Sequence, residues 1–371
     1  MQQNPAVELA TTDVPLRVAP GSRQLAGRAI IGITSAILVV LIFIQLLKTL
    51  GYTEIGFANW RPVALAFVVW AACLCLGLIM TRGQRGQEAV FLLPAVLATF
   101  AFVIFPTIYA LFISFNTWNL SAVSGRQFTG LDNFRQLFQD TGYFNALRNM
   151  AFYVAAVLVQ YVIAYGLALL LNQEIRGRKF FRVVFLIPFM LSPIAVSFMI
   201  GKTIFNSQYG PIIPVLNAIG FHNVSFFEDP WLARLNIMIM DAWYSIPFMM
   251  VLLLAGLQAI PSEILESAKI DGASSGQTFR NMIFPLMLPI SLTAIILRII
   301  FELKLIDVVR VVTGGGPGGA TDTITLFIYR EGIEKTNVGY ATAMSQFYLL
   351  LIIISITIVL WLAGKWIQKV T

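Results

Sequence analysis

The chain has 371 residues, of which 58% are hydrophobic and only 12% are charged. Soluble domains carry about 25% charged residues, so this composition excludes a soluble enzyme or binding module and indicates a polytopic membrane protein. We interpret the formal net charge of +7 as a signal of membrane orientation rather than of nucleic-acid binding. The expected fold class is all-α.

Long apolar stretches follow a polar N-terminal segment. Residues 1–26 are polar and without apolar periodicity, which predicts a disordered cytoplasmic N-terminus. The next apolar run is long enough to cross a bilayer, so no cleavable signal is expected. Segments of about 20 apolar residues predict transmembrane helices. We expect about eight of them, at 28–47, 62–80, 89–115 (kinked at Pro94 and Pro106), 150–172, 184–206, 232–257, 285–307 and 341–364.

The basic residues orient these helices. If the N-terminus lies inside, the inside segments carry 13 Lys and Arg in 81 positions and the outside segments 8 in 106. The higher inside density agrees with the positive-inside rule, and the stretch from Arg176 to Arg182 contributes most to it. Both termini are therefore predicted to be cytoplasmic.

Cysteine and histidine are too few to build a site. Cys73 and Cys75 lie two positions apart in one predicted helix, on different faces, so neither a disulfide nor a metal site is expected. His222 is the only histidine, which excludes a histidine-rich metal site, and its amide and aromatic neighbours indicate a surface residue rather than a member of a Ser–His–Asp triad.

Polar side chains inside predicted spans are costly and therefore candidate sites. Arg298 and Glu302 are four residues apart and can pair on one helix face. Carboxylates, amides and aromatic rings are also the groups that bind sugars; the alternatives are interhelical hydrogen bonds and packing, or proton relay by Asp241 or Glu302. The candidates are Gln160, Asn236, Asp241, Trp243, Tyr244, Arg298, Glu302, Lys304 and Asp307.

A polar, turn-broken stretch separates the sixth and seventh predicted spans. Ser262 is a candidate N-cap for a first short helix, and Gly272 suits a turn with positive φ. Ser274 or Ser275 can cap a second short helix, expected to end at Pro285. Such a helix–turn–helix, joined to the membrane at both ends, is suited to docking rather than catalysis.

A glycine-rich segment, TGGGPGGAT, lies at 313–321. Gly314 and Gly319 have the spacing of a phosphate-binding loop, but Ala320 stands where that motif requires lysine. The segment is also predicted to lie outside, away from ATP. We therefore expect a flexible, tightly turning external loop.

The stretch ESAKIDGASSGQTFRNMIFPLMLP resembles the cytoplasmic EAA loop in permease subunits of bacterial ATP-binding-cassette importers. Ser267, Met282 and Phe284 depart from the family pattern. The matching residues are Glu266, Ala268, Asp271, Gly272, Ala273, Phe279, Pro285, Leu286 and Pro289.

This resemblance implies the domain organisation and the coupling residues. It implies two additional N-terminal helices (27–87), then a six-helix core of the type I importer (88–371). The core would include a coupling loop (261–284) and an external loop (308–340). ATPase-coupling roles are implied for Glu266, Ser267, Ala268, Asp271, Gly272 and Ala273.

The external loops resemble the carbohydrate-importing branch of the family. The segment FTGLDNFRQLF resembles an external stretch of sugar permeases, and Arg298, Lys304 and Asp307 fit the residues that precede TGGGP, with Ile306 replacing phenylalanine. The resemblance implies that a loop made of Gly314, Gly315, Gly316 and Pro317 reaches towards an external binding protein. A purely structural turn is the alternative.

The resemblance implies a non-enzymatic permease subunit that imports a sugar, glycoside or polyol across the bacterial inner membrane by alternating access. Its implied partners are a second permease, two cytoplasmic ATPases that bind ATP and Mg, an external binding protein and membrane lipid. This chain itself would hold no cofactor. The alternatives are import of glycerol 3-phosphate or a similar charged solute, and an ion-coupled secondary transporter.

Overall fold

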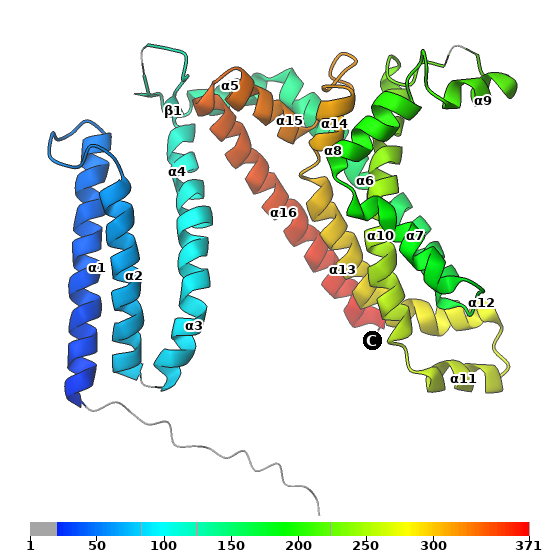
Figure 1. The fold of residues 1–371 in the computed structure, drawn as a ribbon, viewed down its shortest axis with the longest axis horizontal. Helices are drawn as coiled ribbons and strands as arrows, with labels where there is room; N and C mark the ends of the chain where they lie inside the picture. Colours follow the sequence, from blue (N-terminus) through cyan, green and yellow to red (C-terminus); the bar gives the residue numbers. More distant parts are fainter. Residues whose placement is uncertain (1–20, 83, 124, 223, 371) are drawn as a thin grey trace, which may run out of the picture. The chain divides into compact units, whose positions relative to one another are not determined.

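The computed structural model describes residues 21–82, 84–123, 125–222 and 224–370. These residues form two compact units that meet in sequence between Tyr109 and Ala110 (Figure 1), whereas the predicted organisation separates the additional helices from the core after residue 87. Most of the predicted disordered segment lies outside the described residues. Its last part was wrong, because residues 21–26 already belong to the first helix.

The first unit contains a helical hairpin, formed by α1 (Gly21–Thr49) and α2 (Arg61–Arg82), followed by α3 (Gln84–Thr99). The hairpin helices approach each other closely at Gly27 and Gly77, which have no side chain. A Cβ atom added at Gly27 would lie only 2.8 Å from the carbonyl oxygen of Gly77. Trp70 Nε1 donates across the pair to Ser35 Oγ at 2.9 Å. Small residues that allow close approach and interhelical polar bonds are typical of membrane helix pairs.

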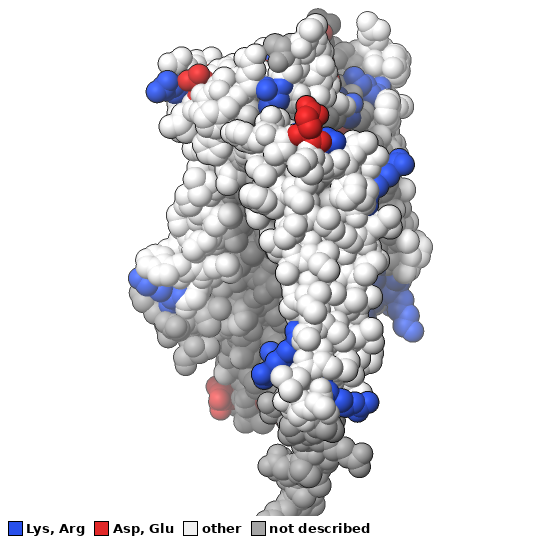
Figure 2. All heavy atoms as spheres, turned by 90° about the vertical axis from the view of Figure 1, so that its left-hand side faces the viewer, with Lys and Arg blue, Asp and Glu red and all other residues white. Residues whose placement is uncertain are grey.

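The outer surface of this hairpin suits lipid rather than water. Large hydrophobic side chains such as Val39, Phe43, Leu65 and Val68 are mostly exposed. In Figure 2, where this hairpin faces the viewer, uncharged side chains fill its middle; its charged residues lie near the helix ends, as Arg28 and Lys48 do in α1 and Arg61 and Arg82 in α2. Such a band matches the hydrocarbon core of a bilayer with charges at its edges.

In the second unit, long helices alternate with short elements. A π-helical segment of the first unit (η1, Phe100–Ile104) joins α3 to α4 (Phe105–Ser114), and the second unit begins within α4 at Ala110. A short antiparallel pair, β1 (Asn116–Thr117) and β2 (Gln127–Phe128), follows. The remaining elements are α5 (Asp132–Gln139), α6 (Thr141–Asn172), α7 (Arg178–Met190), α8 (Pro193–Val196), η2 (Ser197–Ile204), α9 (Ile212–Ala218), α10 (Pro230–Gln258), α11 (Ser262–Ile270), α12 (Ser275–Thr278), η3 (Phe279–Ile283), α13 (Phe284–Glu302), α14 (Asp307–Val312), α15 (Ile324–Tyr329), η4 (Arg330–Glu334) and α16 (Val338–Val370).

Within the described residues, seven helices are long and apolar enough to cross a membrane, or eight if one bent pair counts as a single span. The prediction of about eight spans is confirmed on this count, with two corrections. The span expected at 184–206 is bent by 95° between Met190 and Pro193, because proline disfavours the helical conformation of the residue before it. The span expected at 285–307 ends as a helix at Glu302.

The core of the second unit is formed where α6, α10 and α13 pack together. Asp140 and Asp229 cap α6 and α10 by accepting bonds from the first free backbone amides. Gly256 of α10 lets α13 approach, since an added Cβ would lie 2.6 Å from Ile290 Cδ1. In Figure 1, α11 and α12 lie at one end of this unit, and α9, α14 and α15 lie at the opposite end.

Gly339, near the start of α16, offers a test of this packing. A Cβ at this position would lie 2.2 Å from the carbonyl oxygen of Asn116, which belongs to β1. We expect Gly339→Ala to lower the free energy of unfolding by about 1–3 kcal/mol, measured as a lower midpoint of thermal unfolding in detergent. Gly166→Ala, in open space on α6, is the control and should be neutral or slightly stabilising. Equal midpoints for the two variants would contradict the packing.

Candidate functional site

A buried charge cluster joins α6, α10 and α13. Arg298 of α13 forms ion pairs with Asp241 of α10 and with Glu302 one turn later on its own helix. Gln160 of α6 donates from Nε2 to Asp241 Oδ2 at 2.8 Å and accepts from Arg298 Nε at 2.9 Å. The predicted pairing of Arg298 with Glu302 is confirmed, and Asp241 and Gln160 complete it.

This cluster is almost fully removed from solvent. The side chains of Arg298 and Glu302 are only 3% and 2% exposed. Charges in such a place are tolerated when they are paired and hydrogen-bonded, and Arg298 provides the cation that both carboxylates share. The three helices are therefore fixed against one another by a single guanidinium group.

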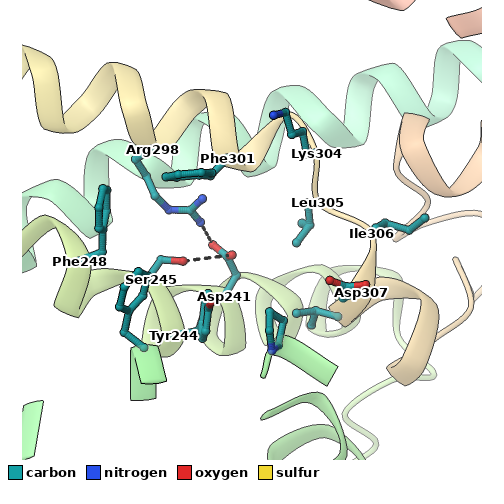
Figure 3. Close-up of a pocket in the computed structure, with 13 residues that line it drawn as sticks. Asp241, Tyr244, Ser245, Phe248, Arg298, Phe301, Lys304, Leu305, Ile306 and Asp307 are labelled. Atoms are coloured by element: carbon teal, nitrogen blue, oxygen red, sulfur yellow. Dashed lines mark hydrogen bonds and ion pairs between the residues drawn. The ribbon is translucent and has the colours of Figure 1, made fainter. Parts of the chain in front are cut away.

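A cavity of about 320 Å³ opens on one side of the cluster. Arg298 and Asp241 point towards each other across it from α13 and α10, and Ser245 joins Asp241 (Figure 3). Lys304 and Asp307 lie on the segment that follows α13 and are exposed. The lining residues are Phe189, Pro193, Asp241, Tyr244, Ser245, Phe248, Arg298, Phe301, Lys304, Leu305, Ile306, Asp307 and Val308.

Aromatic rings form one wall of this cavity. The ring of Phe189 lies 5.6 Å from Tyr244 and 5.5 Å from Phe248, and Phe248 meets Phe301 edge to face at 5.7 Å. Phe189 and Pro193 reach the cavity because the chain bends between α7 and α8. An aromatic wall beside fixed polar groups can bind a ligand that has both an apolar face and hydroxyl groups.

The polar stretch between α10 and α13 is a helix–turn–helix, as predicted. Gly272 has a φ of +74°, and the amides of Gly272 and Ala273 bond back to the carbonyls of Lys269 and Ala268. This pattern is a Schellman motif, which ends α11 with a glycine. Glu266, Ser267 and Asp271 are exposed, Ala268 is buried and Ala273 is half-buried.

Two details of this stretch were predicted wrongly. Pro261, not Ser262, is the N-cap of α11, and Ser262 is its first helical residue. Ser274 caps α12 through a capping box with Gln277, but the helix does not end at Pro285. It continues through η3 into α13, and Pro285, which cannot donate a backbone hydrogen bond, lies two residues after the π-helical turn of η3 ends at Ile283.

The glycine loop (residues 313–321) is held firmly, whereas the sequence predicts a flexible loop. Arg330 pairs with Asp322 and donates to the carbonyl of Gly314. Lys202 Nζ donates to the carbonyl of Val312 at 2.8 Å. Burial raises the pKa of Asp322 and the Arg330 guanidinium opposes that rise, so the ion pair favours the charged carboxylate.

Comparison with known proteins assigns a family to this architecture. Residues 160–370 match the family described as binding-protein-dependent transport system inner membrane component. The chain belongs to this family. The match includes α10 and α13, the helix–turn–helix between them and the glycine loop. The chain is therefore a membrane permease, a translocation subunit rather than an enzyme.

Named relatives of this permease cover most of its length. It is 33% identical over 292 residues to the trehalose/maltose transport system permease protein MalF of Thermococcus litoralis, covering 77% of this chain and 97% of the relative. It is 31% identical over 270 residues to the sn-glycerol-3-phosphate transport system permease protein UgpA of Agrobacterium fabrum, covering 71% and 89%.

A solved structure shares the fold of this permease. A chain of a bacterial alginate ABC transporter, crystallised with an alginate pentasaccharide-bound periplasmic protein, aligns with a TM-score of 0.66 at 20% identity. The alignment covers 84% of this permease and 99% of that chain.

The predicted pathway residues of the permease fall into three groups. Asp241, Tyr244, Arg298, Lys304 and Asp307 line the cavity. Gln160 and Glu302 lie in the charge cluster behind it. The third group, Asn236 and Trp243, belongs neither to the cavity lining nor to the charge cluster. Asn236 donates to the carbonyl of Phe226 at 2.8 Å, and Trp243 is 38% exposed.

Sequence reasoning missed the cavity residues Phe189, Pro193, Ser245, Phe248 and Phe301. Part of the signal is visible in the chain. Tyr244 and Phe248 are four residues apart, and Arg298 and Phe301 are three apart, so each pair shares a helix face. Pro193 marks a helix boundary, but the direction of the bend is not written in the local sequence.

Arg298 tests the dependence of the permease on its charge cluster. Arg298→Met leaves Asp241 and Glu302 buried without a cation, and we expect a loss of about 3–5 kcal/mol in stability, measured by thermal unfolding in detergent. Adding Glu302→Gln and Asp241→Asn should recover a large part of the loss. Arg176→Gln, at an exposed position between α6 and α7, is the control. Normal stability of Arg298→Met alone would show that the ion pairs contribute little.

Proposed function

We propose that this chain is one of two transmembrane subunits of an ATP-driven importer that receives a carbohydrate from an external binding protein. The observation that supports this most directly is the cavity between α10 and α13, where an aromatic wall faces Asp241 and Ser245. Aromatic rings stack on the apolar face of a sugar ring, and carboxylate and hydroxyl groups bind pairs of sugar hydroxyls. The trehalose/maltose name of one relative points in the same direction.

The charges around the cavity favour a neutral solute over glycerol 3-phosphate. Two of the three cations that could bind a phosphate are already engaged: Arg298 with Asp241 and Glu302, and Lys202 with the carbonyl of Val312. Lys304 remains, with Asp307 in the same lining. The lining carries two cations, Arg298 and Lys304, and two carboxylates, Asp241 and Asp307. It therefore offers a phosphate dianion no net positive charge, and the UgpA resemblance is the weaker guide to the cargo.

Energy would enter through the α11–α12 helix–turn–helix. Glu266 is exposed, and Ile270 is 86% exposed at the end of α11, beside the Gly272 turn. An exposed apolar side chain next to an acidic one suits docking on a basic partner with an apolar pocket. We assign that partner as one of two cytoplasmic ATPases, which would bind ATP and Mg and move α10 and α13 when they close.

The glycine loop would meet the external binding protein. It lies at the end of the second unit opposite α11 and α12 (Figure 1), as a loop on the outer side must if the helix–turn–helix is cytoplasmic. The proposed location is the bacterial inner membrane, with both termini inside and a second permease alongside. The ion-coupled alternative has no comparable support, because the helix–turn–helix would then have no partner.

Uptake by the reconstituted complex tests this assignment. Liposomes that contain the chain, its second permease, the ATPases and the binding protein should accumulate a labelled oligosaccharide only when ATP is supplied on the side of the membrane where the ATPases lie. Labelled glycerol 3-phosphate is the competing cargo. Uptake of the phosphate alone would overturn the carbohydrate assignment, and uptake driven by an ion gradient without ATP would overturn the importer class.

Gly272 and Glu266 test the coupling role. Proline cannot adopt the φ of +74° at Gly272 and lacks the amide hydrogen that bonds to Lys269. We expect Gly272→Pro, and likewise Glu266→Arg, to reduce transport at least tenfold per ATP hydrolysed, about 1.4 kcal/mol or more of lost coupling. The measurement is the ratio of solute imported to phosphate released.

Gly276→Ala, at an exposed position on α12 with open space around it, is the matched control for these two variants. It should leave the coupling ratio unchanged. A normal ratio for both Gly272→Pro and Glu266→Arg would remove the docking role from this loop.

A further inference from the structure

One face of α6 carries polar side chains along half of its length. Asn145, Asn149, Tyr153 and Gln160 are spaced by four, four and seven residues, which keeps them on one side of a helix. We call them the α6 polar face. Asn149 and Tyr153 are fully buried and Gln160 is 2% exposed. Such a row in a membrane helix requires partners along its whole length.

At one end, this face holds the glycine loop. Asn145 and Asn149 donate from Nδ2 to the carbonyl of Gly319 at 2.7 and 2.9 Å, and Asn149 also donates to the carbonyl of Asp322 at 3.0 Å. The hydroxyl of Tyr153 donates to the carbonyl of Thr321 at 3.1 Å. Three side chains of α6 therefore bind three carbonyl groups within residues 319–322, where the glycine loop ends.

The orientation of the Asn149 amide is set by a further residue. Arg234 of α10 donates from Nε to Asn149 Oδ1 at 3.2 Å, while its guanidinium lies over the Trp231 ring at 4.9 Å. Because the amide oxygen is occupied by a cation, its nitrogen faces the loop carbonyls. Asn149 thus joins α6, α10 and the loop at one point.

At the other end, the same face holds the charge cluster. Gln160 lies 15 residues after Asn145, a distance of about 22 Å along a helix axis. Its amide bonds to Asp241 and accepts from Arg298, two residues that line the cavity. The segment after α13 is tied to the loop region as well, since Thr325 Oγ1 donates to the carbonyl of Leu305 at 2.6 Å.

We propose that the α6 polar face transmits the position of the glycine loop to the charge cluster, and that Asn149 and Tyr153 are its positioning residues. Separating the loop from α6 would leave several buried donors without acceptors, which is costly, so the two move together. A shift of α6 along or about its axis then changes how Gln160 meets Asp241 and Arg298. The inference rests on the proposed function, in which the binding protein docks on this loop.

The test uses the full transporter in lipid nanodiscs with its binding protein. ATP hydrolysis is measured without and with loaded binding protein, together with binding-protein affinity. For Tyr153→Phe and Asn149→Ala we expect affinity and unstimulated hydrolysis within about twofold of the wild type. Stimulation by the binding protein should fall about fivefold or more, the lower edge of ordinary allosteric coupling.

Asn133→Ala is the matched control. Asn133 of α5 is also buried and also donates to two carbonyls, those of Ser114 and Asn116, each at 2.9 Å. It holds β1 and not the glycine loop, so stimulation should be retained. Gln160→Leu combined with Tyr153→Phe adds a second readout: if the face acts as a unit, the two losses are not additive.

Each other outcome is decisive. Wild-type stimulation in both Tyr153→Phe and Asn149→Ala, or an equal loss in Asn133→Ala, overturns the transmission role. If binding-protein affinity falls but stimulation at saturation is intact, Asn149 and Tyr153 contribute only to docking, and the transmission role is also overturned. A wild-type complex that no binding protein stimulates would refute the proposed function itself, and this inference with it.

Discussion

The structure of the second unit depends on one buried cation. Arg298 is shared by Asp241 and Glu302, and Gln160 supplies the amide that completes the arrangement. A guanidinium group presents donors in fixed directions, so the relative rotation of α6, α10 and α13 is restricted to arrangements that satisfy it. An apolar contact of the same area would tolerate sliding. The charge cluster therefore makes the packing of three largely apolar helices specific. Apolar burial alone cannot do this in lipid, because lipid tails are as apolar as the side chains.

Two of these helices, α10 and α13, also connect the cavity to the helix–turn–helix formed by α11 and α12. α10 runs from the Arg234 contact through the cavity residues to Gln258, only a few residues before α11. On the return path, α12, η3 and α13 follow one another without a break, from the capping box at Ser274 to Glu302. In the proposed function, movement of the helix–turn–helix would be passed directly to the two helices that carry Asp241 and Arg298. The distance between the two sites is bridged by rigid secondary structure rather than by a chain of loops.

Features that depend on neighbours in sequence were predicted better than features that depend on contacts between distant segments. The i, i+4 spacing was sufficient to predict the pairing of Arg298 with Glu302, and residue type was sufficient to predict the positive φ of Gly272 and to name Ser274 as one of two candidate caps. Each of these features depends on neighbours in sequence. Asp241 as the second partner of Arg298 depends on how two helices meet, and no periodicity contains that. Apolar runs located the spans, yet they gave no warning that α13 ends at Glu302 or that the glycine loop is bound to α6, since hydropathy does not register hydrogen-bond partners 170 residues away.

The bend between α7 and α8 has a consequence for water. α7 contains 13 residues and is about 20 Å long, which is shorter than the hydrocarbon core of about 30 Å. If α7 begins at one surface of the bilayer, the interrupted backbone around Leu191 and Ser192 lies within the hydrocarbon core, where lipid offers no hydrogen bonds. Non-helical backbone at such depth persists only when it is enclosed by protein or borders an aqueous space. Phe189 and Pro193, on either side of the break, both face the cavity. The cavity beside the bend is a place where these backbone groups can reach water, and an arriving solute would then replace that water with its own hydroxyl groups.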